Sequence, residues 1–300
     1  NTAQEFMKKE YWNIIISAIF CGLIIPGGQF FSNLGFSLYE ISAYSLLFLF
    51  LITLPILAIK KTMPLSKNTL VFFIVYGFIG ALLQLTQFGG VVFGTPVAIV
   101  ALLLYTQPIW TTLFGSVFLN EEISRKKLLP VSIAFLGVIF LLSPWNISNI
   151  GSSKGIVSSL IAGIFLSLWV VFARKTSINK VYYINTLSAY SLISFLWLII
   201  LWPAAKLIYQ NGSLTRLSYQ FPIEYWAFFV LFSLVGAFLP NYFFYKGITN
   251  VEASKAGVIL ILEPVVASIL GIVLFSQYLS SSIFLGGGLI LVSNYLAIKE

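Results

Sequence analysis

Long apolar runs alternate with short polar clusters along the whole chain of 300 residues. A membrane-spanning helix needs roughly 20 mostly apolar residues to cross the hydrocarbon core, and ten of the runs approach or exceed that length. The predicted helices cover residues 11–32, 40–59, 69–90, 96–119, 128–143, 155–173, 183–205, 224–246, 254–277 and 282–298. The pattern therefore predicts an all-α, polytopic membrane protein with ten transmembrane helices.

The composition leads to the same class. Hydrophobic residues make up 59% of the chain and charged residues only 9%. A soluble domain carries roughly 25% charged residues, so this chain has too little polar surface to cover itself in water. A lipid bilayer is therefore its expected surrounding.

The residue types that are missing exclude several kinds of chemistry. The sequence has one cysteine, Cys21, no histidine and no aspartate, so that all nine acidic residues are glutamates. These counts argue against a disulfide framework, a metal site or histidine-based catalysis. No nucleotide-binding loop is present either. We therefore expect neither an enzyme nor a cofactor.

The basic residues predict how the helices are oriented. Fourteen lysines and arginines fall on one side of the ten-helix arrangement, whereas the other side has only Lys154, Lys206 and Arg216. The positive-inside rule then places both termini in the cytoplasm. Because these charges lie at the ends of apolar runs, we expect no nucleic-acid partner. The run after Lys8 and Lys9 lacks a signal-peptide cleavage site and is predicted to be a retained helix.

The two halves of the chain repeat each other at an offset of 156 residues. Twelve identities lie at this offset in two blocks, residues 72–88 and 104–129 of the first half. The pairs are Phe72/Phe228, Phe73/Phe229, Gly80/Gly236, Ala81/Ala237, Leu83/Leu239, Phe88/Phe244, Leu104/Leu260, Pro108/Pro264, Gly115/Gly271, Val117/Val273, Ser124/Ser280 and Leu129/Leu285. We therefore divide the chain into five-helix repeats at residues 1–150 and 151–300.

A five-helix unit is odd-numbered, so two copies in series must have opposite orientations in the membrane. The charged segment NEEISRKK (Asn120–Lys127) corresponds to the uncharged SQYLSSSI (Ser276–Ile283), as expected when one loop is cytoplasmic and the other external. Inverted repeats are a transporter architecture, because they provide two related conformations open to opposite sides. A duplicated scaffold without transport is the alternative.

The repeated motifs resemble those of the drug/metabolite transporter superfamily, in its EamA-like branch. They are QPIWTTLFGSVFLNEEIS (Gln107–Ser124) with LLPVSIAFLGVIFLLSP (Leu128–Pro144), and EPVVASILGIVLFSQYLS (Glu263–Ser280) with FLGGGLILVSNYLA (Phe284–Ala297). The resemblance implies a central cavity walled by helices 1, 3, 4, 6, 8 and 9. It also implies substrates among amino acids, other small metabolites and drugs, often exported. In this chain, the helix-end glutamate Glu121 is replaced by Gln277 in the second copy.

One carboxylate, Glu263, interrupts the apolar run Ala256–Phe275 and directly precedes Pro264. Ionising a carboxylate near the bilayer centre costs at least about 2.5 kcal/mol. At the offset of 156, Glu263 corresponds to Gln107, which precedes Pro108. A proline leaves a carbonyl one turn earlier unpaired, and such backbone is tolerated at this depth only when buried or lining a cavity. Either Glu263 and Gln107 bind substrate beside two helix breaks, or Glu263 only fixes a kink.

Other polar residues extend this candidate substrate site. Gln84 and Gln87 are three residues apart and share a helix face, and Asn241 lies near their counterparts in the second half. Polar residues of this kind also hold membrane helices together, which is their alternative role. The first helix is expected to break at Pro26, Gly27 and Gly28, next to Gln29. A broken helix exposes N–H groups to a substrate carboxylate, although a hinge or close packing would explain the break equally well.

Four aromatic residues on the expected cavity helices are candidates for stacking or cation–π contacts with a substrate. They are Tyr105, Trp110, Trp169 and Tyr245. Lipid contact is the alternative role for each of them.

The arginines limit the substrate class. All three, Arg125, Arg174 and Arg216, lie at loops or helix ends. A site for sugar phosphates or nucleotides needs planar arginine clamps near the membrane centre, so a zwitterionic or cationic small molecule is favoured.

These observations predict a secondary-active transporter in the inner or plasma membrane. It would move small amphiphilic metabolites such as amino acids by alternating access, as an exporter. Glu263 would either contact a substrate ammonium group or carry a coupling proton. One alternative is export of cationic, aromatic drugs with Glu263 as counter-ion, and the other is a membrane scaffold.

Overall fold

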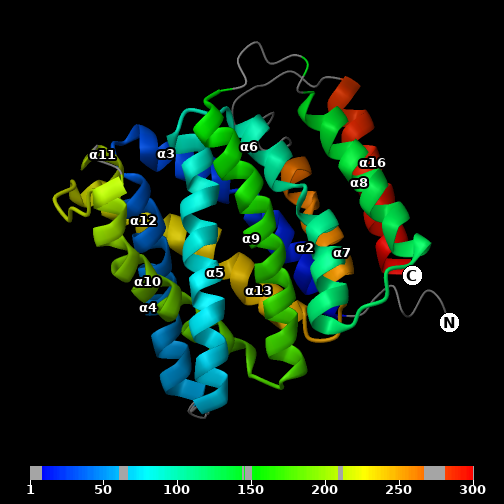
Figure 1. Ribbon diagram of the computed structural model, residues 1–300, viewed down its shortest axis with the longest axis horizontal. Coiled ribbons are helices and arrows are strands. Elements are labelled where there is room, and N and C mark those ends of the chain that lie inside the picture. Colours follow the sequence, from blue (N-terminus) through cyan, green and yellow to red (C-terminus); the bar gives the residue numbers. More distant parts are fainter. Residues whose placement is uncertain are drawn as a thin grey trace.

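The computed structural model describes residues 9–60, 67–143, 145, 151–208, 212–266 and 281–299, and every regular element in these ranges is helical (Figure 1). The first half contains α2 (Lys9–Cys21), α3 (Ile24–Asn33), α4 (Leu38–Lys60), α5 (Lys67–Val92), α6 (Val97–Leu104), α7 (Gln107–Leu119) and α8 (Arg125–Leu142). The second half contains α9 (Ser153–Ile178), α10 (Tyr183–Ile208), α11 (Gly212–Thr215), α12 (Ile223–Phe232), the π-helix η2 (Ser233–Phe238), α13 (Leu239–Gly247), α14 (Ala253–Leu260) and α16 (Ser281–Lys299).

Seven helical stretches in the described ranges are long and apolar enough to cross a membrane. They are Lys9–Asn33, Leu38–Lys60, Thr69–Val92, Ile99–Leu119, Ser153–Ile178, Tyr183–Leu207 and Ile223–Gly247. The predicted fifth and tenth helices correspond to α8 and α16, which are outside these seven. The predicted ninth helix begins with α14, and its part beyond Val266, including Gln277, lies outside the described residues.

Three prolines explain where the membrane helices are interrupted. A proline has no N–H and so leaves the carbonyl four residues earlier without its helical partner. α6 ends at Leu104, four residues before Pro108, and α14 ends at Leu260, four residues before Pro264. Likewise α2 ends at Cys21, and the next residue, Gly22, lies four residues before Pro26. The first interruption therefore lies at residues 22–23, one turn earlier than the sequence alone predicts.

Pro26, Gly27 and Gly28 accordingly lie inside α3. Gly28 packs against the ring of Phe88 and Gly27 against that of Phe232. These two glycines therefore allow close approach of α3 to its neighbours instead of forming the break.

A fourth proline distinguishes the two halves. Pro240 follows η2, where the helix widens to the π form, whereas the corresponding Gln84 lies within the uninterrupted α5. A π-helical turn within an α-helix is rare and is often found at functional sites.

Two pairs of corresponding helices share their bounds, and one of these pairs packs side by side in antiparallel directions. At the offset of 156, α6 matches α14 residue for residue, and α8 matches α16 to within one residue. α8 and α16 lie side by side (Figure 1). Ser293 Oγ donates to the Pro130 carbonyl oxygen at 2.7 Å, and a Cβ on Gly137 would lie 2.9 Å from the Gly286 carbonyl oxygen. Because Pro130 corresponds to Gly286 and Gly137 to Ser293, these two contacts are reciprocal.

Apolar side chains fill the interior and also cover the outside of the bundle. The largest interior cluster includes Phe73, Tyr76, Trp169 and Phe244. On the outer face, Val71 and Ile200 are each 64% exposed. An apolar outer face is what a helix bundle presents to lipid tails.

Candidate functional site

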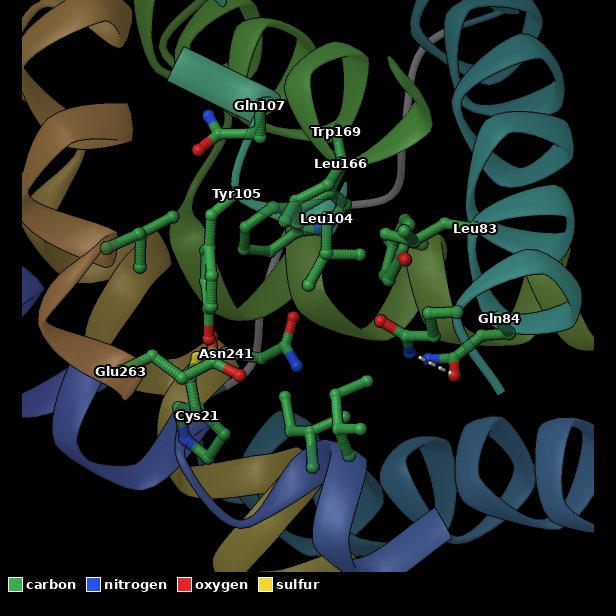
Figure 2. Close-up of a pocket in the computed structure, with 16 residues that line it drawn as sticks. Cys21, Leu83, Gln84, Leu104, Tyr105, Gln107, Leu166, Trp169, Asn241 and Glu263 are labelled. Carbon is green, nitrogen blue, oxygen red and sulfur yellow. Dashed lines mark hydrogen bonds between the residues drawn. The ribbon is translucent and has the colours of Figure 1, made fainter. Parts of the chain in front are cut away.

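A cavity lies where the broken helices meet (Figure 2). Its walls come from the α2–α3 and α6–α7 breaks, α5, α9, α10, α13 and the end of α14. The lining residues are Cys21, Ile24, Ile25, Leu83, Gln84, Gln87, Leu104, Tyr105, Gln107, Leu166, Trp169, Tyr190, Pro240, Asn241, Leu260 and Glu263. The predicted walls from helices 1, 3, 4, 6, 8 and 9 are thus all represented.

Glu263 lies at one end of this cavity, and its side chain is largely buried, with 7% of the residue surface exposed. The Tyr105 hydroxyl points to the Glu263 carboxylate and is its hydrogen-bonding neighbour (Figure 2). Asn241 lines the same cavity and is drawn next to them in this view. The carboxylate thus lies in the cavity wall just after the end of α14 and directly before Pro264. Glu263, Tyr105 and Asn241 are called the polar end below.

Two glutamines of α5 line the cavity at a distance from the polar end. Gln87 Nε2 donates to Gln84 Oε1 at 2.8 Å. This bond uses the side-chain oxygen of Gln84 and leaves the N–H groups of the Gln84 side-chain amide available to a ligand. The pair can therefore donate to a carboxylate or carbonyl group, whereas Glu263 can accept from a cation.

Gln107 lines the cavity but also has a local partner. Its side-chain amide donates to Thr111 Oγ1, and Thr111 Oγ1 donates to the backbone carbonyl oxygen of Gln107 at 2.9 Å. A Cβ on Gly257 would lie 2.8 Å from Gln107 Nε2, so α14 approaches α7 closely at this point. Gln107 therefore lies where α7 and α14 meet at the cavity wall.

Three predicted site residues lie outside the cavity lining. Gln29 donates to Asn33 Oδ1 at 2.8 Å on α3, and the Trp110 ring stacks near Phe114 with centroids 6.4 Å apart. Tyr245 is fully enclosed next to the cavity wall, with 2% exposure. The other seven predicted residues, Glu263, Gln107, Gln84, Gln87, Tyr105, Trp169 and Asn241, all line the cavity.

Tyr245 belongs instead to a hydrogen-bonded group of three aromatic residues. The hydroxyls of Tyr245 and Tyr76 lie 2.7 Å apart, and Trp169 Nε1 donates to Tyr245 Oη at 3.0 Å. Tyr76 Oη also donates to the Trp169 carbonyl oxygen at 3.1 Å. These bonds connect α5, α9 and α13 next to the cavity, since Trp169 also lines it.

Sequence reasoning missed three lining positions of interest. Cys21 lies at the α2–α3 break, Pro240 follows the π-helix, and Tyr190 comes from α10, a helix absent from the predicted walls. A proline inside an apolar run marks broken backbone. Pro240 could therefore have been singled out from the sequence in the same way as Pro108 and Pro264. Nothing in the sequence distinguishes Tyr190 from other aromatic residues.

Charged contacts lie at the two ends of the bundle, away from the cavity. At one end, the Glu121 carboxylate accepts from Ala253 N at 2.7 Å and from Ser254 Oγ at 2.8 Å, and so caps α14. Arg174 donates to the carbonyl oxygens of Ile248 and Thr249 there. We call this the Glu121 end. It joins the first half to the α13–α14 connection.

The opposite end, here the Arg216 end, contains a buried carboxylate that sequence analysis overlooked. Ser37 and Glu40 form a capping box at the start of α4: Glu40 N donates to Ser37 Oγ at 3.0 Å, and Ser37 N to Glu40 Oε2 at 2.7 Å. Arg216 Nε donates to Glu40 Oε1 at 3.0 Å, and this hydrogen bond raises the pKa of Arg216 above its ordinary value. The S-x-x-E spacing before an apolar run was the available signal.

The charge of the cavity limits what it can hold. Among the sixteen described residues that line it, Glu263 is the one acid, and none is lysine or arginine. Phosphate groups are normally held by arginine or lysine, so the lining suits neutral, zwitterionic or cationic small molecules.

The comparisons with known proteins give a consistent result. A family model described as "EamA-like transporter family" matches the chain over residues 8–143 and again over residues 153–299. A protein of Archaeoglobus fulgidus named "Uncharacterized transporter" is 25% identical over 288 residues, covering 96% of this chain and 95% of that protein. One of Clostridium kluyveri with the same name is 24% identical over 304 residues, covering 97% and 93%. A solved crystal structure superposes with a TM-score of 0.73 at 14% identity, covering 96% and 94% of the two chains, which shows a common fold.

Proposed function

The chain belongs to the EamA-like transporter family, and from this premise we propose that it exports small amphiphilic metabolites, chiefly amino acids or related compounds, by secondary-active alternating access. Family membership makes it an integral membrane transporter and not an enzyme. The substrate class, direction and mechanism are our proposal. The observation that carries it is a cavity at the helix breaks that combines one carboxylate, several amides and no basic side chain among the described residues.

We also propose that ten helices form two inverted five-helix repeats, residues 1–150 and 151–300. The antiparallel, reciprocal contacts of α8 with α16 support this arrangement. The helix segments α7 and α14, from the predicted fourth and ninth helices, are also antiparallel: Gln107 lies at Gly257 while Glu121 caps the start of α14 at Ala253. A two-fold axis in the membrane plane would relate α8 to α16, and alternating access would exchange the conformations of the two repeats.

For orientation, we propose that the Glu121 end and both chain termini face the cytoplasm of an inner or plasma membrane. Basic residues gather at the Glu121 end: Lys60 contacts Tyr182, Lys127 pairs with Glu252, Arg174 reaches Thr249 and Lys175 reaches Phe118. Excess lysine and arginine marks cytoplasmic ends of membrane helices.

A second candidate function is export of cationic, aromatic drugs. The aromatic rings of Tyr105, Trp169 and Tyr190 in the lining favour it, with Glu263 as counter-ion. The donors of Gln84 favour a zwitterion, because a drug cation has no carboxylate for them to bind. A scaffold without transport would show neither ligand binding nor flux.

The test is a ligand panel on the purified full-length protein, followed by flux in proteoliposomes. The panel contains amino acids, quaternary ammonium dyes and sugar phosphates. A ligand at one hundred times its Kd adds about 2.7 kcal/mol to the stability of the folded state, so binding raises Tm measurably. We expect amino acids to raise Tm and to be transported. Stabilisation by dyes alone would favour drug export, and no ligand effect together with no flux would favour the scaffold.

The variant Glu263→Gln separates the two roles of the carboxylate. If Glu263 carries a coupling proton, the variant loses transport driven by a pH gradient but keeps exchange of substrate across the membrane. If it binds an ammonium group, both activities fall together. Unchanged transport in both assays would leave Glu263 with the structural role alone.

A further inference from the structure

The amide of Asn241 has an orientation that its surroundings fix. Asn241 Nδ2 donates to the carbonyl oxygen of Ala237, one turn earlier, at 2.8 Å. A carbonyl oxygen can pair only with the NH2 side of an amide, so the opposite orientation would place two acceptors together. The Nδ2 donor of Asn241 is thus used by the backbone of the π-helix. The acceptor of the same amide, Oδ1, is not used by this bond.

This acceptor is buried and has no hydrogen-bond partner among the described residues. A buried polar atom without a partner destabilises the fold, and so such an atom in a cavity wall calls for an explanation. Asn241 and Glu263 line the same cavity, and their side chains are neighbours in the view of Figure 2. The polar end therefore offers two acceptors, the Asn241 carbonyl oxygen and the Glu263 carboxylate.

We propose that Glu263 and Asn241 form a subsite for a primary ammonium group, and that Asn241 Oδ1 makes the site prefer primary amines to quaternary ammonium ions. A primary ammonium has three N–H donors and can serve both acceptors at once. A quaternary ammonium has none, so it would satisfy the charge of Glu263 but leave Asn241 Oδ1 unpaired. The inference rests on the proposed transport of amino-acid-like compounds. It adds that the site requires N–H donors on the ammonium group of its ligand.

Four probes of equal charge test this requirement: 2-phenylethylammonium and its N-methyl, N,N-dimethyl and N,N,N-trimethyl derivatives. Their N–H donors fall from three to none while the aromatic part stays the same. Binding is measured by titration of the purified full-length protein. We expect affinity in the wild type to fall at least about tenfold from the primary to the trimethyl compound, the size of a lost charged hydrogen bond. Equal or tighter binding of the trimethyl compound would overturn the proposal.

The variant Asn241→Leu removes the acceptor at similar side-chain size, and Asn294→Leu is its matched control. Asn294 Nδ2 also donates one turn back, to the Ile290 carbonyl oxygen at 2.9 Å, and its Oδ1 likewise has no partner among the described residues. It lies on α16, outside the cavity lining. We expect the preference for the primary amine to shrink to about threefold or less in Asn241→Leu and to persist in Asn294→Leu. A preference that persists in both variants would also overturn the proposal.

Comparing the ratio of affinities between the wild type and each variant cancels the greater lipophilicity of the methylated probes. If Asn241→Leu fails to fold, the wild-type series can still overturn the proposal, through equal or tighter binding of the trimethyl compound. The proposal can fail separately from the transport function: amino-acid flux without discrimination among the four probes overturns only the ammonium subsite. If no panel amino acid is transported, the proposed function fails instead, whatever the probes show.

Discussion

A single hydroxyl group, that of Tyr245, connects three helices beside the cavity. It lies 2.7 Å from the Tyr76 hydroxyl and accepts from Trp169 Nε1 at 3.0 Å. Replacing Tyr245 by phenylalanine keeps the ring packing but leaves the buried Trp169 N–H without its acceptor. We expect the free energy of unfolding to fall by about 1–2 kcal/mol, and we would measure it as a lower Tm in detergent.

The control for this change is Tyr219→Phe. Tyr219 is 80% exposed in the connection before α12, so losing its hydroxyl should leave Tm unchanged. An equal fall in Tm for both variants would contradict a specific role for the three-residue group. A fall in transport without any fall in Tm for Tyr245→Phe would instead point to movement of α13 against α9 during the cycle.

The sequence identifies polar cavity residues better than aromatic ones. Amide and carboxylate side chains inside apolar runs are costly unless they are buried with partners, so Glu263, Gln84 and Gln87 stand out in the pattern. Aromatic rings suit the lipid face, the core and a cavity equally well. Tyr105 and Trp169 line the cavity while Tyr245 and Trp110 do not, and only the relative rotation of the packed helices decides this.

At the scale of elements, Gly286 is a position where α16 approaches the backbone of α8 closely. A Cβ on Gly286 would meet the backbone of Leu141 and lie 2.6 Å from the Gly137 carbonyl oxygen, whereas a Cβ on Gly288 would have nothing within 4 Å. Gly286→Ala must therefore push the two helices apart. We expect it to lower the free energy of unfolding by about 1–3 kcal/mol, as overpacking does, and to lower Tm accordingly.

Gly288→Ala is the matched control two residues along the same helix. It should keep or slightly raise Tm, because alanine favours helix more than glycine does. Equal stability of the two variants would show that α8 and α16 do not touch at Gly286 in the membrane.

The helix breaks were predictable in kind but displaced in position. Proline chemistry acts on the carbonyl four residues earlier, so each interruption precedes its proline; the expectation at Pro26–Gly28 placed the first one too late. The π-helix before Pro240 has no simple sequence pattern, because it depends on how the widened turn packs against neighbouring helices.

For the whole molecule, the sequence identifies the class through composition and the family through its repeated motifs. The family model matches twice, over residues 8–143 and 153–299, close to the predicted repeats. The substrate could not be predicted in the same way. It depends on which side chains the two halves bring together, and residues such as Asn241 and Glu263 are distant from Gln84 in the sequence.

Orientation in the membrane is a property of the whole molecule, and two cysteine variants can test it. The native Cys21, which lines the cavity, is first replaced by serine. Gln220→Cys then places a thiol at the Arg216 end, and Asn179→Cys places one at the Glu121 end; both positions are exposed. Because the basic residues gather at the Glu121 end, we expect a membrane-impermeant maleimide to label Gln220→Cys in intact cells. Asn179→Cys should react only after permeabilisation. The reverse pattern would place the Glu121 end outside the cell, and labelling of both in intact cells would contradict ends on opposite sides of the membrane.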